Sequence, residues 1–130
     1  SALDHSIAEL FIATEAYRHA SQRFLADAGE AGPDRVTLGR LNDHLLQLEK
    51  SFLLESGLQG RPWSQSLFAS PDPFSGYASW MLPGLQYEIL EGDSASLAAW
   101  QETYTSAVTT LAERVASLTV ELEMNLSSRD

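Results

Sequence analysis

Apolar residues recur at helical spacing in three long stretches of the chain, residues 4–28, residues 34–55 or 37–55, and residues 94–126. Within each stretch they return every three or four positions, as on one face of an amphipathic α-helix. A shorter stretch at residues 83–91 also fits a helix, because its leading proline suits a first helical turn and Gly92 follows its end. No alternating strand pattern is visible, so the sequence predicts four helices and no sheet.

Local signals set the expected ends of the long helices. Ser6 followed by Glu9 fits a capping box for the first helix, with Asp4 as a competing cap. Gly29 is expected to end the first helix and Gly57 the second, because glycine is favoured just beyond the last helical turn.

The segment between the second helix and the short helix, residues 56–83, is long for a connection without regular structure. It contains four of the five prolines and two of the three tryptophans of the chain. Disordered segments are poor in aromatic residues, whereas this one has Trp63, Phe68, Phe74, Tyr77 and Trp80. We therefore expect an all-α fold, a four-helix bundle with a long ordered loop between the second and third helices.

Composition limits the classes of function. A chain of 130 residues fits one domain, so we expect residues 1–130 to form a single one. Eighteen acidic and eight basic residues give a net charge of −10, which argues against nucleic acid and against contact of this segment with an anionic membrane. The absence of cysteine excludes disulfides, thiolate metal sites and cysteine nucleophiles.

Residue types that carry chemistry are present but do not form a recognised motif. His5, His19 and His44 lack the spacing of a helix-borne metal site and fit solvated or capping positions. Most carboxylates fall opposite the apolar stripes, as on a solvated helix face. The sequence has no nucleophile elbow, phosphate-binding loop or dinucleotide fingerprint. We therefore expect no catalytic residue, no metal site and no cofactor in this chain.

Two interpretations stay open for the tip of the loop. Gly76 permits an unusual backbone conformation or a close approach by another group, and the hydroxyl of Tyr77 is available to a ligand. In the alternative interpretation, Tyr77 packs beneath the loop, as aromatic side chains usually do.

A set of short motifs occurs in a fixed order through the middle of the chain. It consists of Asn42-Asp43-x-Leu45-x-x-Leu48-Glu49-x-x-Phe52, Gly57-Leu58, Arg61-Pro62-Trp63, Phe68-Ala69-Ser70-Pro71, Tyr77-Ala78 and Pro83-Gly84. The set resembles the helical dimerisation domain of the transferrin receptor and glutamate carboxypeptidase II family. In those carboxypeptidases the matching segments are NDxLxxLExxF, GLPxRPF, YAP and KYAGxxFPG. The similarity covers about residues 38–91.

The resemblance implies a homodimerisation domain at the C-terminal end of a larger protein that also has a zinc peptidase-like domain and an apical domain. Zinc is then expected only in the peptidase-like domain, and the whole protein would be a zinc-dependent carboxypeptidase-like or aminopeptidase-like hydrolase. The expected partners are a second copy of the protein and the peptidase-like domain of the same chain. The resemblance also favours a location outside the cytoplasm, as a secreted, periplasmic or membrane-anchored protein.

The resemblance assigns places to individual loop residues as well. The loop is expected to line the substrate pocket of the peptidase-like domain, with Tyr77 at the position of a tyrosine that binds the C-terminal glutamate of the substrate. Gly76 replaces the lysine of the family's Lys-Tyr pair, which removes a cation that would bind a carboxylate. The other residues expected in the loop or at its interface are Arg61, Pro62, Trp63, Trp80, Pro83 and Gly84.

Two other functions remain as alternatives. A stand-alone helical bundle that binds a small ligand under the loop would use Tyr77 and Trp63. An acidic adaptor for partner helices would depend only on charge and amphipathic helices, and it would leave the aromatic loop without a role.

Overall fold

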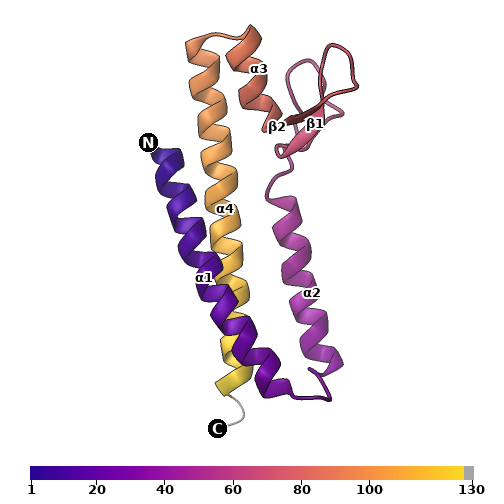
Figure 1. Cartoon of the computed structure of the whole chain (residues 1–130), viewed down its shortest axis with the longest axis vertical. Helices are drawn as coiled ribbons and strands as arrows, with labels where there is room; N and C mark the ends of the chain where they lie inside the picture. Colours follow the sequence, from indigo (N-terminus) through magenta and orange to yellow (C-terminus); the bar gives the residue numbers. More distant parts are fainter. Residues whose placement is uncertain (128–130) are drawn as a thin grey trace. The chain divides into compact units, whose positions relative to one another are not determined.

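The chain, in a computed structural model that describes residues 1–127, is mainly helical (Figure 1). The described residues contain four helices and one two-stranded sheet. In chain order these elements are α1 (Ala2–Ala28), α2 (Arg35–Lys50), β1 (Ala69–Pro71), β2 (Ser79–Met81), α3 (Pro83–Glu91) and α4 (Ser94–Ser127). The prediction of a mainly helical fold with four helices is confirmed.

The chain divides into two compact units, and α4 contributes to both. The helical unit consists of Ser1–Ser51 together with α4 from Val108 onward, and the loop unit is Phe52–Ala107. Because α3 belongs to the loop unit and α1 and α2 to the helical unit, each unit is described by itself. The arrangement of all four helices as one bundle stays a prediction.

The helical unit is held by a small apolar core. Its buried residues are Ala20, Phe24, Leu41, Leu118 and Leu122, with Tyr17, Leu48 and Leu126 packed around them. Each large side chain buried in this way stabilises the fold by roughly 1.5–3 kcal/mol.

Polar contacts add to this core. The Ser6 and Thr109 hydroxyl oxygens lie 3.0 Å apart and connect α1 to α4. Arg114 donates to the Gln47 carbonyl at 2.7 Å and to the Ser51 hydroxyl at 2.9 Å, which connects α4 to the end of α2.

The first helix begins earlier than predicted. The capping box is formed by Ser1 and Asp4, so the prediction of Ser6 with Glu9 was wrong. Ser6 lies inside α1, where its hydroxyl donates to the Ala2 carbonyl. Gly29 ends α1 with φ of 66°, as expected for a glycine stop.

The second helix ends earlier than predicted, at Lys50 rather than at residue 55, so Gly57 is not its stop. The backbone beyond it pairs with a later part of the loop instead of continuing the helix. Leu54 N–H donates to the Gln65 carbonyl at 2.8 Å, and Leu67 N–H donates to the Phe52 carbonyl at 2.8 Å. These long-range bonds satisfy the groups that a further helical turn would have used.

The prediction of no strands was also wrong. β1 and β2 are antiparallel, with Ala69 opposite Met81, Ser70 opposite Trp80 and Pro71 opposite Ser79. Strands of three residues are too short to show a two-residue alternation in sequence. The pair closes the loop into a hairpin and places Ser70 and Trp80 on its buried side.

Candidate functional site

The tip of the loop, residues 72–78, is organised around one carboxylate. Asp72 is only 7% exposed and accepts hydrogen bonds from the backbone N–H groups of Phe74, Ser75 and Ala78 and from the Ser75 hydroxyl. Its own N–H donates to the Ala78 carbonyl at 2.8 Å. Gly76 has φ of 74°, a left-handed conformation that glycine adopts without strain. The tip is therefore a closed turn with a fixed backbone.

The hydrogen bonds from Ser75, first from its hydroxyl and then from its N–H, hold the pKa of Asp72 well below its ordinary value of 3.8, with Ala78 and Phe74 adding to the effect. The ionised form is thus the one that the folded tip prefers.

We expect Asp72→Asn to loosen the tip, because an amide lacks the charge that strengthens these bonds and offers one acceptor oxygen instead of two. Since the folded pKa is lowered, the contribution of Asp72 is present above pH 3.8 and is lost as the pH falls from there toward the lowered pKa. Hydrogen exchange at the Ser75 and Ala78 amides measures both effects. Unchanged protection of these amides in the variant would contradict the role given to Asp72.

Tyr77 extends from this tip into solvent. Its side chain is 96% exposed, so it does not pack beneath the loop. It borders a shallow, open hollow of about 320 Å³ formed by residues 69–71 and 76–79. Gly76 lies on the same rim, and a side chain added there would meet no atom within 4 Å. The two residues expected at the substrate pocket therefore lie together on an accessible surface of the loop unit.

The Arg61-Pro62-Trp63 motif forms a second turn of the loop unit. Arg61 donates to the Pro71 carbonyl at 2.7 Å and lies 3.5 Å from the Ser70 hydroxyl, which connects this turn to β1. Trp63 is 78% exposed. The turn is thus connected to β1, and it carries a large aromatic side chain that is mostly exposed to solvent.

The Pro83-Gly84 motif lies in the interior of the loop unit. Both residues are buried at the start of α3. The Tyr104 hydroxyl, from α4, accepts a hydrogen bond from Gly84 N–H at 3.1 Å and donates to the Leu67 carbonyl at 2.7 Å. Trp80 is buried as well and meets the Phe74 ring edge-on, with ring centroids 6.0 Å apart. Trp80, Pro83 and Gly84 are therefore interior residues of the loop unit and do not form its outer surface.

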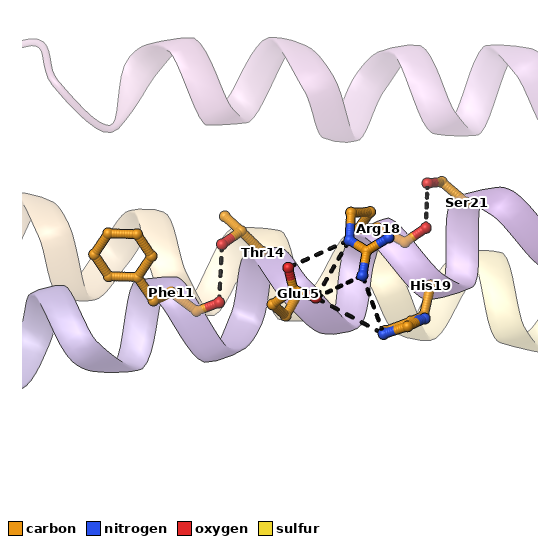
Figure 2. A network of polar contacts seen from close by, with 6 residues as sticks. All are labelled: Phe11, Thr14, Glu15, Arg18, His19 and Ser21. Atoms are coloured by element: carbon orange, nitrogen blue, oxygen red, sulfur yellow. Dashed lines mark hydrogen bonds and ion pairs between the residues drawn. The ribbon is translucent and has the colours of Figure 1, made fainter.

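The helical unit exposes both apolar and charged side chains along α1. Phe11 is 70% exposed and Leu25 is 63% exposed. Between them, Glu15 binds Arg18 at 3.0 Å and lies 3.7 Å from His19 (Figure 2). The hydrogen bond from Arg18 lowers the pKa of Glu15 below its ordinary value. Such exposed ion pairs contribute little stability, so this group fits a solvated helix face.

The histidines and carboxylates do not converge. Within residues 1–127, no group of three or more His, Asp or Glu side chains is arranged to hold a metal ion. His5 and His19 are exposed, and His44 is half-buried. A search of the same residues for a helix able to cross a membrane finds none that combines the length and the apolar character required.

Two buried groups of the loop unit were not identified from sequence. Asp72 organises the tip and Tyr104 connects three segments, yet neither was singled out. Asp72 lies in the run Pro-Asp-Pro-Phe-Ser-Gly, and Asp among Pro, Ser and Gly is a recognisable turn signal, so Asp72 could have been found. Tyr104 could not, because its partners lie 20 and 37 residues away in the chain.

Comparison with known protein families identifies the family of the chain. The sequence model of the transferrin receptor-like dimerisation domain matches residues 1–116, and the chain belongs to that family. The resemblance seen in the motifs is thus confirmed. Membership implies a role in forming a homodimer, and a dimerisation domain is not catalytic by itself.

Proposed function

We propose that residues 1–130 form the single homodimerisation domain of a larger zinc peptidase-like protein, and that the loop lies against the peptidase-like domain of the same protein. The observation that carries this proposal is the exposure of Tyr77 and Trp63, 96% and 78%, on turns whose backbones are fixed. Exposed aromatic side chains on a fixed backbone are characteristic of interface positions, because they offer a large contact area and have only two side-chain torsions to order on binding.

The scaffold under these side chains supports the proposal. Asp72 fixes the tip that presents Tyr77, and Arg61 connects the turn that presents Trp63 to β1. A loop that served only as a connection would not need two such anchors. Both aromatic side chains are therefore suited to meet a surface supplied from outside the loop unit.

Within this proposal, Tyr77 and Gly76 line the substrate pocket of the peptidase-like domain. Gly76 brings no ammonium group to the pocket, so binding of an acidic C-terminal residue would have to depend on other groups. The zinc ions and catalytic residues belong to the peptidase-like domain, which makes the whole protein a carboxypeptidase-like or aminopeptidase-like hydrolase. Its proposed location is outside the cytoplasm.

Tyr77→Phe in the full-length protein tests the pocket assignment. If the hydroxyl contacts the substrate, its loss costs about 1 kcal/mol, and KM for peptide substrates should rise about fivefold. Tyr87→Phe is the matched control, because Tyr87 is half-buried on α3 and its hydroxyl makes no hydrogen bond with residues 1–127. Equal KM values for wild type and Tyr77→Phe across several peptides would remove Tyr77 from the pocket.

A further inference from the structure

One face of the helical unit is hollowed between α1 and α4. The hollow has a volume of about 610 Å³, and every residue that lines it belongs to the helical unit. A neighbouring hollow of about 900 Å³ shares Val120 and Glu123 with it and continues toward Arg23. Together the two hollows form one groove along α1, which we call the α1–α4 groove.

The lining of this groove suits another helix. Its small residues are Ala13, Ala16, Ala112 and Ala116. Small side chains allow a second helix to approach closely, since the distance between packed helices depends on the residues at the contact. Ile12 is 65% exposed and Val120 is 53% exposed, and both line the groove. Apolar surface is therefore available to whatever occupies it.

Two carboxylates stand together on one part of the groove. Glu9 follows Ser6 by three residues and Glu113 follows Thr109 by four, so both lie about one turn beyond the bond that joins Ser6 to Thr109. Both side chains are exposed, and neither makes a hydrogen bond or ion pair with another residue in 1–127. This part of the groove therefore has an unmet preference for a cation.

A suitable cation, Arg23, lies on the same helix, as many residues after Ala16 as Glu9 lies before it. Glu9, Ala16 and Arg23 are spaced seven residues apart, which places them on one line of α1 with a drift of only ~20° per step. Arg23 is exposed and also makes no side-chain hydrogen bond or ion pair with the described residues. On this line of α1 a carboxylate therefore stands on one side of Ala16 and a guanidinium on the other, while Asp27 and Glu123 line the same hollow as Arg23.

We propose that the α1–α4 groove receives α1 of a second copy of this chain, antiparallel to its own α1, with the two-fold axis at Ala16. In this register Arg23 of each copy lies between Glu9 and Glu113 of the other. A two-fold interface requires a face that is complementary to itself, and the line from Glu9 to Arg23 meets that requirement. The proposal rests on the homodimerisation proposed above and specifies the surface and register.

Membership of a dimerisation family makes a second copy the expected occupant, and the charge of the chain restricts the register in which it binds. With a net charge of −10, two copies repel one another in most orientations. Among residues 1–127, Arg23 is the sole Lys or Arg that lines the two hollows. A register that brings Arg23 to a carboxylate of the partner offsets part of this repulsion, and the antiparallel register does so at two symmetric places.

Charge reversal in the full-length protein tests the register, with the dimer dissociation constant measured by analytical ultracentrifugation. Arg23→Glu places three carboxylates together at each end and should raise the constant at least about tenfold. Glu9→Arg should also raise it, because two arginines then face one another. The double variant Glu9→Arg/Arg23→Glu restores the opposite charges and should return the constant to within about threefold of wild type.

The matched control exchanges a charge pair outside the groove. Glu15→Arg/Arg18→Glu keeps a local pair on α1 (Figure 2) and should leave the constant unchanged. A monomeric wild type at micromolar concentration would overturn the proposed dimerisation itself. A dimeric wild type with an unaffected Arg23→Glu variant would overturn only the register proposed here.

A cysteine probe gives an independent result. The chain has no cysteine of its own, so Ala16→Cys places a defined thiol on the proposed axis. A short bismaleimide should join the two copies through this position, and mass spectrometry should find residue 16 joined to residue 16. Gln22 is exposed and lies outside the groove lining, so Gln22→Cys should not cross-link. A stable dimer without the residue 16 cross-link would contradict the proposed axis.

Discussion

Gly57→Ala should destabilise the loop unit more than a Gly→Ala change at either of the other loop glycines, Gly60 and Gly76. Gly57 has φ of 76°, a left-handed conformation that costs a residue with a side chain about 1–2 kcal/mol. A methyl group there would also lie 2.5 Å from both the Cα and the carbonyl oxygen of Pro62. Because these are backbone atoms of a turn, they can move only if the turn changes shape. Forced overpacking of this kind costs about 1–3 kcal/mol more.

Gly60→Ala separates the two causes. Gly60 has φ of 66°, but a methyl group added there would meet no atom within 4 Å. It should therefore show the conformational cost without the clash. Tryptophan fluorescence during urea unfolding is the suitable measurement, because Trp63, Trp80 and Trp100 all belong to the loop unit. Equal losses in the two variants would show that the approach of Pro62 has no energetic importance.

Tyr104→Phe should have the second large effect. The hydroxyl is buried, donates to the Leu67 carbonyl and accepts from Gly84 N–H. Removing it leaves two buried backbone groups without a partner, and each such group costs about 1–3 kcal/mol. We expect a loss of about 2–6 kcal/mol in the free energy of unfolding of the loop unit. Tyr87→Phe, which removes a hydroxyl without a bonded partner in residues 1–127, should change it by less than about 0.5 kcal/mol.

The pH dependence gives a second readout for Tyr104. Burial raises the pKa of its hydroxyl to about 12 from an ordinary value of 10.0, although the bond from Gly84 opposes the shift. Since the folded pKa is raised, the stabilisation is complete below pH 10 and decreases as the pH rises toward 12. Ultraviolet titration of the wild type should show a late-titrating phenol that is lost in Tyr104→Phe. A titration curve that is the same in the wild type and in Tyr104→Phe above pH 10 would contradict this burial.

Gly57→Ala and Tyr104→Phe should both weaken the loop unit, the first at a turn and the second at a buried hydroxyl. Gly57 permits the turn that carries Arg61 and Trp63. The Tyr104 hydroxyl bonds to the Leu67 carbonyl and to Gly84 N–H, and so joins the loop at Leu67 to the start of α3. Neither position lines the hollow beside Tyr77, so each variant should affect the loop unit without removing the group proposed to meet the substrate. Reduced stability and altered KM would then be separable effects.

Sequence periodicity predicted the helices well because their stabilising contacts are local. α3 has the predicted bounds, and Gly29 and Gly92 end their helices as expected. The end of α2 could not be predicted in the same way. The apolar stripe continues to Phe52, but the backbone there bonds to residues 65–67 instead. Periodicity reports which face is apolar, and it does not report a competing hydrogen-bond partner far along the chain.

The sequence alone determined the family, the helices, the acidic charge and the presence of an aromatic loop, because these follow from residue order and local propensity. Only the tertiary structure decided which loop residues face solvent. Trp63 and Tyr77 are exposed, whereas Trp80, equally aromatic, lies on the buried side of the short hairpin. The physical reason is that exposure depends on contacts between distant segments, such as Tyr104 with Leu67 and Gly84, or Arg61 with Pro71. No local pattern encodes those contacts, and they determine which surfaces the loop can offer to a partner.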